Sequence, residues 1–99
     1  MNTSKKEKFL KKYRLNKDEI KLLNEMEQND YTLKRKKEIK QQQIEIESIL
    51  NSIPDERERI LLQRKFYLGQ TYEVISEKMN YSISHIKRLY KKAIENLKM

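Results

Sequence analysis

Apolar residues recur three and four positions apart along most of this chain, which is the spacing of an amphipathic helix. In the first third of the chain, this spacing predicts a short basic helix over residues 5–13 and a second helix over residues 17–28. Asn16 and Glu19 have the types and spacing of a capping box, in which each side chain bonds a free backbone amide. We therefore expect the second helix to begin just after Asn16.

A longer helix is predicted from a cap at Thr32 to Ser52. Gln42 and Gln43 lie on the same side as its apolar stripe, at about 100° per residue. A polar residue in a seam between two helices disfavours misaligned pairing. The stripe therefore fits either a homodimer formed through Leu33–Ile53 of two copies or packing within one chain. The aliphatic members of the stripe are Ile39, Ile46, Ile49, Leu50 and Ile53, and Leu33 and Ile44 lie outside it.

The segment Ser52–Glu56 is the sharpest boundary in the chain. Pro54 suits a first helical turn, because the missing amide hydrogen has no partner there, and the acids that follow suit the positive end of the helix dipole. The boundary separates a basic helical region over residues 1–52, which we expect to dimerise or bind a partner, from a second unit over residues 53–99. Gly69 is expected to end the new helix in the left-handed conformation. The predicted stripe of that helix comprises Arg57, Ile60, Leu61, Arg64 and Tyr67.

Two helices joined by about three residues are predicted after Gly69. Thr71 caps the first helix and Ser82 caps the second. Asn80 turns the chain between them, because asparagine enters the left-handed region more readily than most residues. The small Ser76 lets the two helices cross closely. This spacing is typical of a DNA-binding helix-turn-helix, in which the later apolar residues Ile86 and Leu89 hold the second helix down.

The last predicted helix separates apolar residues from basic ones. Between Ser82 and Met99 there are five Lys or Arg residues against one Glu. Such a face suits DNA, because each cation that neutralises a phosphate releases condensed counterions. The apolar side comprises Ile86, Leu89, Tyr90, Ala93, Ile94 and Leu97, and the opposite side comprises Ser84, Lys87, Arg88, Lys91 and Lys92.

The composition narrows the classes of fold and function. One Gly and one Pro leave few sites for hairpin turns or glycine-rich phosphate loops, so an all-α fold is predicted. With no Cys, one His and no nucleophile beside a base, neither an enzyme nor a metal or other cofactor is expected. The net charge of +8 favours a polyanionic partner. No apolar run approaches the length of a membrane span, and the expected location is the cytoplasm of a bacterial host.

Several segments of the second half resemble region four of sigma factors. The small size, the basic front half and the turn Met79–Ser82 also resemble phage late-transcription regulators of the RinA/ArpU type. Ile83 and Ser84 stand where sigma factors commonly carry an arginine and a glutamate that read the promoter, so sigma-like promoter preference is not carried over. The segments that carry the resemblance are Ile53–Leu61, Arg64–Phe66, Gly69–Ser76, Tyr81–Ser82 and Lys92–Leu97.

The resemblance implies a transcription regulator that binds double-stranded DNA through the helix after Ser82, acts at a late-gene-type promoter and contacts RNA polymerase. Arg88 is also supported by charge geometry, since its guanidinium fits the two acceptors of guanine. His85 serves equally as a surface histidine, and the ring of Tyr72 serves equally as partial core. By position, the residues expected at base edges are Ser84, His85 and Arg88, and those expected at phosphates are Tyr72, Lys87, Lys91 and Lys92.

Two other interpretations keep the fold but change the partner or the assembly. The first is a protein-interaction module of a mobile element that binds another regulator or RNA polymerase instead of DNA, which the long isoleucine-lined helix and Ile83 favour. The second is a small DNA-packaging recognition subunit, which would form rings. Mutation of Lys87, Arg88 and Lys91 separates the protein-interaction module from the regulator, because only DNA binding depends on their charges.

Overall fold

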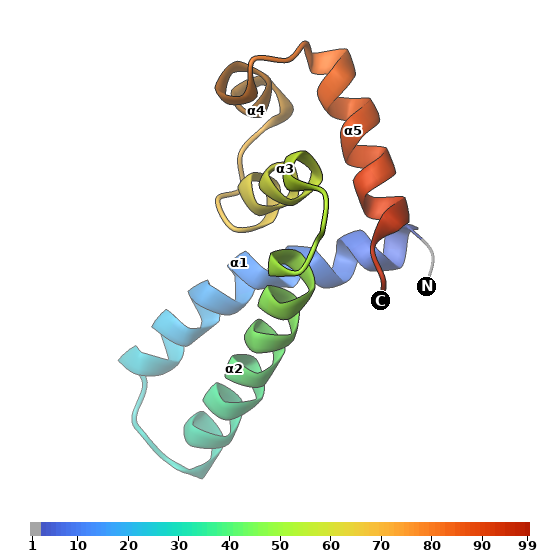
Figure 1. The fold of residues 1–99 in the computed structure, drawn as a ribbon. Helices are drawn as coiled ribbons and strands as arrows, with labels where there is room; N and C mark the ends of the chain where they lie inside the picture. Colours follow the sequence, from blue (N-terminus) through green and yellow to red (C-terminus); the bar gives the residue numbers. More distant parts are fainter. Residues whose placement is uncertain (1–2) are drawn as a thin grey trace.

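The computed structural model describes residues 3–99, which form five helices joined by short turns (Figure 1). No strand occurs within this range, and the predicted all-α class is confirmed. Figure 1 shows α1 and α2 as a hairpin whose closed end points away from α4 and α5. The helices are α1 (Thr3–Glu25), α2 (Asp30–Asn51), α3 (Glu56–Phe66), α4 (Tyr72–Met79) and α5 (Ile83–Asn96).

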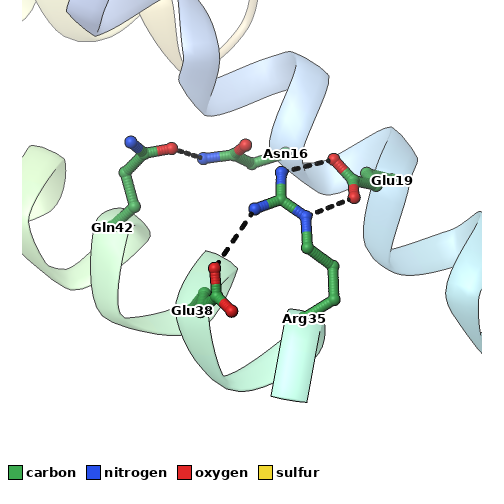
Figure 2. A network of polar contacts seen from close by, with 5 residues as sticks. All are labelled: Asn16, Glu19, Arg35, Glu38 and Gln42. Carbon is green, nitrogen blue, oxygen red and sulfur yellow. Dashed lines mark hydrogen bonds and ion pairs between the residues drawn. The ribbon is translucent and has the colours of Figure 1, made fainter. Parts of the chain in front are cut away.

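The first helix is continuous, so the prediction of two helices with a boundary at Asn16 was wrong. Asn16 is buried in the middle of α1, and its amide group donates to Gln42 Oε1 over 2.7 Å and to Gln43 Oε1 over 2.8 Å. These acceptors on α2 satisfy the side chain that was expected to cap a helix. The two glutamines therefore fix the register of α2 against α1 within one chain. Figure 2 shows the contact between Asn16 and Gln42.

Glu19, the other member of the expected capping box, also contacts α2 (Figure 2). Its carboxylate accepts hydrogen bonds from Arg35 Nε over 2.6 Å and from Arg35 Nη2 over 2.9 Å. A third arm of the same guanidinium lies 3.7 Å from Glu38 Oε2. The bidentate geometry favours the charged form of both partners. The hydrogen bond from Arg35 is the main cause of the lowered pKa of Glu19.

The start of α2 differs from the prediction by one turn, because Asn29 rather than Thr32 is the N-cap. Asn29 Oδ1 accepts from the Thr32 amide over 3.1 Å, and Thr32 Oγ1 accepts from the Asn29 amide over 2.9 Å. Thr32 therefore takes the third helical position of a reciprocal capping box and is fully buried. The preceding helix ends at Glu25 rather than Gln28.

The isoleucine stripe of α2 faces the molecule's own interior. Ile39, Ile46 and Leu50 are buried, whereas Leu33 and Ile44 are exposed, as predicted. Because α1 packs along this side of α2, the alternative of packing within one chain accounts for the stripe. Most of the seam predicted for a homodimer is therefore covered within one chain, whereas its last residues, Ile49 and Ile53, are half-buried.

The predicted stripe of α3 was correct only in part. Asp55 is the N-cap and its carboxylate accepts from the Glu58 amide over 3.0 Å, so Pro54 precedes the cap instead of lying in the first turn. The buried apolar residues are Leu61, Leu62 and Phe66, whereas Arg57 is exposed and Ile60 is half-buried. Because α3 packs against all four other helices, it buries residues on more than one side. Periodicity alone therefore predicts its buried residues poorly.

One hydrophobic core joins both parts of the chain. Leu10 and Tyr13 of α1 belong to the same cluster as the buried residues of the last three helices. The long first helix therefore supports the second half of the chain by packing against α3 and α5, and it passes below α3 in Figure 1. The remaining buried members are Ile46, Leu50, Leu61, Leu62, Phe66, Ile75, Ile86, Leu89, Tyr90, Ala93, Ile94 and Leu97.

Candidate nucleic-acid interface

The predicted caps set the angle and spacing of α4 and α5. Thr71 Oγ1 accepts from the Val74 amide over 3.2 Å, and Ser82 Oγ accepts from the His85 amide over 3.1 Å. Between the helices, Asn80 has φ 59° and ψ 42°, the left-handed conformation expected from its type. These local signals, all predicted from the sequence, produce a helix-turn-helix.

The apolar side of α5 packs against the rest of the protein and is excluded from solvent. All of its predicted apolar residues are buried, including Leu97 at the C-cap, and Ile75 of α4 is fully buried against them. A helix that buries one side so completely is fixed in rotation about its own axis. The opposite side therefore faces solvent in a defined orientation.

The outer side of α5 carries positive charge. Ser84, Lys87, Arg88, Lys91 and Lys92 are all exposed, and the first turn of the helix contains no acidic residue. The structure thus brings together the five polar residues that periodicity placed on this side. We call this set the basic face. A side chain of Arg or Lys on such a face can reach a base edge or a phosphate when a helix enters the major groove.

His85 lies beside the basic face and is partly covered. Its ring centroid is 4.3 Å from that of Tyr81, with an angle of 30° between the planes. Tyr81 also makes a side-chain hydrogen bond with Arg57, which raises the pKa of that arginine. The imidazole therefore packs against the Tyr81 ring at the edge of the site, whereas the four cations of the basic face are exposed.

Tyr72 is half-buried at the start of α4. Its ring packs edge-on against Tyr90, with 5.6 Å between centroids. Lys65 Nζ lies 4.2 Å from the ring centroid and Lys87 Nζ lies 5.8 Å from it. Burial, followed by the charge of Glu7, raises the pKa of the Tyr72 phenol. Tyr72 is thus a structural neighbour of the basic face and holds two cations over its ring.

Lys6 of α1 supports the end of α5, a contact near the candidate site that the sequence did not reveal. Its side chain is buried, and Nζ donates to the carbonyl oxygens of Ile94 over 3.1 Å, Glu95 over 3.2 Å and Leu97 over 2.9 Å. The last carbonyls of a helix have no partner within it, and the negative end of its dipole favours a cation. Lys6 therefore caps the C-terminus of α5 from the other end of the chain, where no local motif could indicate it.

A second support joins α1 to the back of α5. Tyr90 Oη donates to Glu7 Oε2 over 2.6 Å. Burial raises the pKa of the Tyr90 phenol strongly, and the Glu7 carboxylate raises it further. The phenol therefore remains a hydrogen-bond donor at any physiological pH, and Glu7 holds the middle of α5 as Lys6 holds its end.

Residues 3–99 offer neither a metal site nor a membrane-spanning helix. This part of the chain contains no group of three or more His, Asp or Glu side chains that could hold a metal ion. Its helices are also too short or too polar for one of them to cross a membrane.

The comparison with protein families identifies the second half of the chain. The model of sigma-70, region 4 matches residues 50–99, which contain α3, α4, α5 and the whole basic face. Neither the curated proteins nor the solved structures gave a match. Region 4 is a DNA-binding helix-turn-helix with a regulatory rather than a catalytic role. The matched range includes the helix-turn-helix that α4 and α5 form. The chain belongs to the sigma-70 region 4 family.

Proposed function

We propose that this protein is a sequence-specific transcription regulator of a phage or mobile element, which binds duplex DNA by placing the basic face of α5 in the major groove. The observation that carries the proposal is the division of α5 into a fully buried apolar side and an exposed side with four cations. The family match supports it, because region 4 binds DNA. Such a regulator acts in the cytoplasm of its host, at a promoter of the late-gene type.

The residues of the basic face take different roles in this proposal. Arg88 reads guanine through its two-pronged guanidinium, and Ser84 lies one turn earlier, where the start of a recognition helix meets base edges. The three lysines neutralise phosphates and release counterions. His85 and Tyr72 contribute at the edge, as a base contact and a phosphate contact. The three lysines are Lys87, Lys91 and Lys92.

A second partner is favoured by a groove on another part of the molecule. An open groove of about 880 Å³ lies where the end of α2, the start of α3 and the end of α5 meet. Ile49, Ile53 and Leu97 give it an apolar floor. A protein segment, such as one from RNA polymerase or another regulator, could bind there. This surface supports the alternative of a protein-interaction module, either beside DNA binding or instead of it.

The proposal is tested by selecting duplexes from a random pool with the purified chain and measuring affinity for the selected site. Arg88→Ala should lower discrimination between the selected site and a scrambled site by about 1–3 kcal/mol. Lys40→Ala is the matched control, because it removes one exposed cation of α2 far along the chain from the basic face. The proposal fails if the wild-type chain binds no duplex at low salt, or if the two variants behave alike.

A further inference from the structure

A small hollow beside the helix-turn-helix is lined by three cations from two helices, together with three uncharged residues. It measures about 230 Å³ and is bounded by Lys11, Arg14, Lys65, Phe66, Gly69 and Gln70. We propose that this hollow binds a phosphate of the DNA backbone, so that the DNA-binding surface extends beyond the family domain onto α1. The inference rests on the proposed function and adds a second place of contact to it.

Within residues 3–99, none of the three cations of the hollow forms an ion pair with a carboxylate. Neither ion pair described for residues 3–99 includes Lys11, Arg14 or Lys65. Glu7 lies one turn before Lys11, but its carboxylate accepts the hydrogen bond of Tyr90. Like charges gathered at one place repel one another, and a bound anion removes that cost. A phosphate diester, with a single negative charge and two free oxygens, suits a small hollow rimmed by donors.

Gly69 lets the Arg14 guanidinium approach the turn before α4. The residue has φ +65°, and a Cβ atom built there would collide with the Arg14 side chain. The positive φ favours glycine, and a side chain at this position would displace the flexible Arg14 guanidinium. Besides turning the chain two residues after the C-cap Tyr67 of α3, Gly69 thus leaves room for a cation of α1 beside the start of the helix-turn-helix.

Arg64 adds a further positive charge behind the hollow. Its Nη1 donates to Gln70 Oε1 over 3.4 Å, and Gln70 lines the hollow. Arg64 Nε is buried and has no hydrogen-bond partner. The arginine thus orients Gln70 and strengthens the positive potential where the phosphate would bind.

Lys65 connects the hollow with the basic face of α5. Its Nζ lies over the Tyr72 ring at 4.2 Å, and Lys87 Nζ of α5 lies 5.8 Å from the centroid of that ring. Positive charge is therefore continuous from Lys87, across Tyr72, to Lys65 and the hollow. When α5 lies in the major groove, the DNA backbone that borders this groove would pass along this path of positive charge. The hollow adjoins the basic face, which the proposed function assigns to DNA. We therefore favour a DNA phosphate as its ligand.

The test compares full-length variants for binding to the selected duplex over a series of salt concentrations. The double variant Lys11→Gln/Arg14→Gln should reduce the slope of log K against log salt by about 0.9 for each phosphate contact that is lost. Its preference for the selected over a scrambled site should not change, since phosphate contacts carry no sequence information. Arg14→Lys, which keeps the charge, should retain most of the slope.

The matched control is Lys21→Gln/Lys40→Gln, which removes the same charge from exposed positions of α1 and α2 outside the hollow. Circular dichroism melting curves verify that each variant is folded, and Lys11→Gln alone replaces the double variant if that one unfolds. A wild-type slope in the hollow variant, with specific binding retained, overturns this inference and leaves the proposed function standing. Absence of any duplex binding by the wild-type chain overturns both.

Discussion

The stability of α5 depends on single side chains from other helices, and Lys6 of α1 is one of them. Lys6 is 8% exposed, and its ammonium group donates to three carbonyl oxygens at the end of α5. A buried carbonyl without a partner costs free energy, and a charged donor satisfies it more strongly than a neutral one. The lysine therefore contributes to the stability of the segment that carries the basic face.

We predict that Lys6→Met lowers the free energy of unfolding by about 1.5–3 kcal/mol, because methionine keeps the apolar stem but removes the charged donor that the three carbonyls share. The Ile94 carbonyl keeps its hydrogen bond from the Leu97 amide. Urea denaturation followed by circular dichroism measures the change. Lys8→Met is the control, since Lys8 is exposed on the same helix. Equal midpoints for the two variants would show that Lys6 does not stabilise α5.

At the scale of helices, elements with strong local signals were predicted well and those decided by distant contacts were not. Thr71, Asn80 and Ser82 bond residues three or four positions away, so their types were sufficient to predict the helix-turn-helix. The apolar side of α5 was predicted because its periodicity is clear. Asn16 was misassigned because its partners on α2 are remote in sequence, and residue type alone cannot distinguish a cap from a buried contact.

The contact between α1 and α2 makes stability depend on pH. The hydrogen bond from Arg35 lowers the pKa of Glu19 in the folded state below its unfolded value, so the resulting stability is present above the unfolded pKa. It is lost as the pH falls through the folded pKa. The free energy of unfolding of the wild type should therefore decrease more between about pH 5 and pH 3 than that of Glu19→Gln.

Urea denaturation at a series of pH values measures this difference. Glu45→Gln, which removes an exposed carboxylate of α2 outside the described ion pairs, is the control and should follow the wild type. Because the Glu19–Arg35 pair is partly exposed, the effect is small and salt should weaken it. Parallel curves for wild type and Glu19→Gln would show that the pair does not stabilise the hairpin.

At the scale of the whole molecule, the two parts of the chain share one core and carry their charge outside it. Leu10 of α1 is completely buried in the cluster that includes Ile86 and Ile94 of α5. The net charge of +8 is distributed over both parts, so DNA would meet positive charge on α1 as well as on α5. Because the core is shared, a substitution in the buried side of α1 should also destabilise α5.

We predict that Leu10→Ala destabilises the entire chain by about 2–5 kcal/mol, because it leaves a cavity in the shared core. Hydrogen exchange of amides in α5 should accelerate together with that in α1. Leu15→Ala is the control, since Leu15 is exposed on α1. Faster exchange confined to α1 would show that the two parts are stabilised independently.

The most direct measurement of the central claim is a titration of the isotope-labelled chain with the selected duplex, followed by amide chemical shifts. The account predicts the largest changes at Ser84, Lys87, Arg88, Lys91 and Lys92, with smaller ones at the buried residues behind them. Changes concentrated at the groove that Ile49, Ile53 and Leu97 line, with the basic face unaffected, would contradict it.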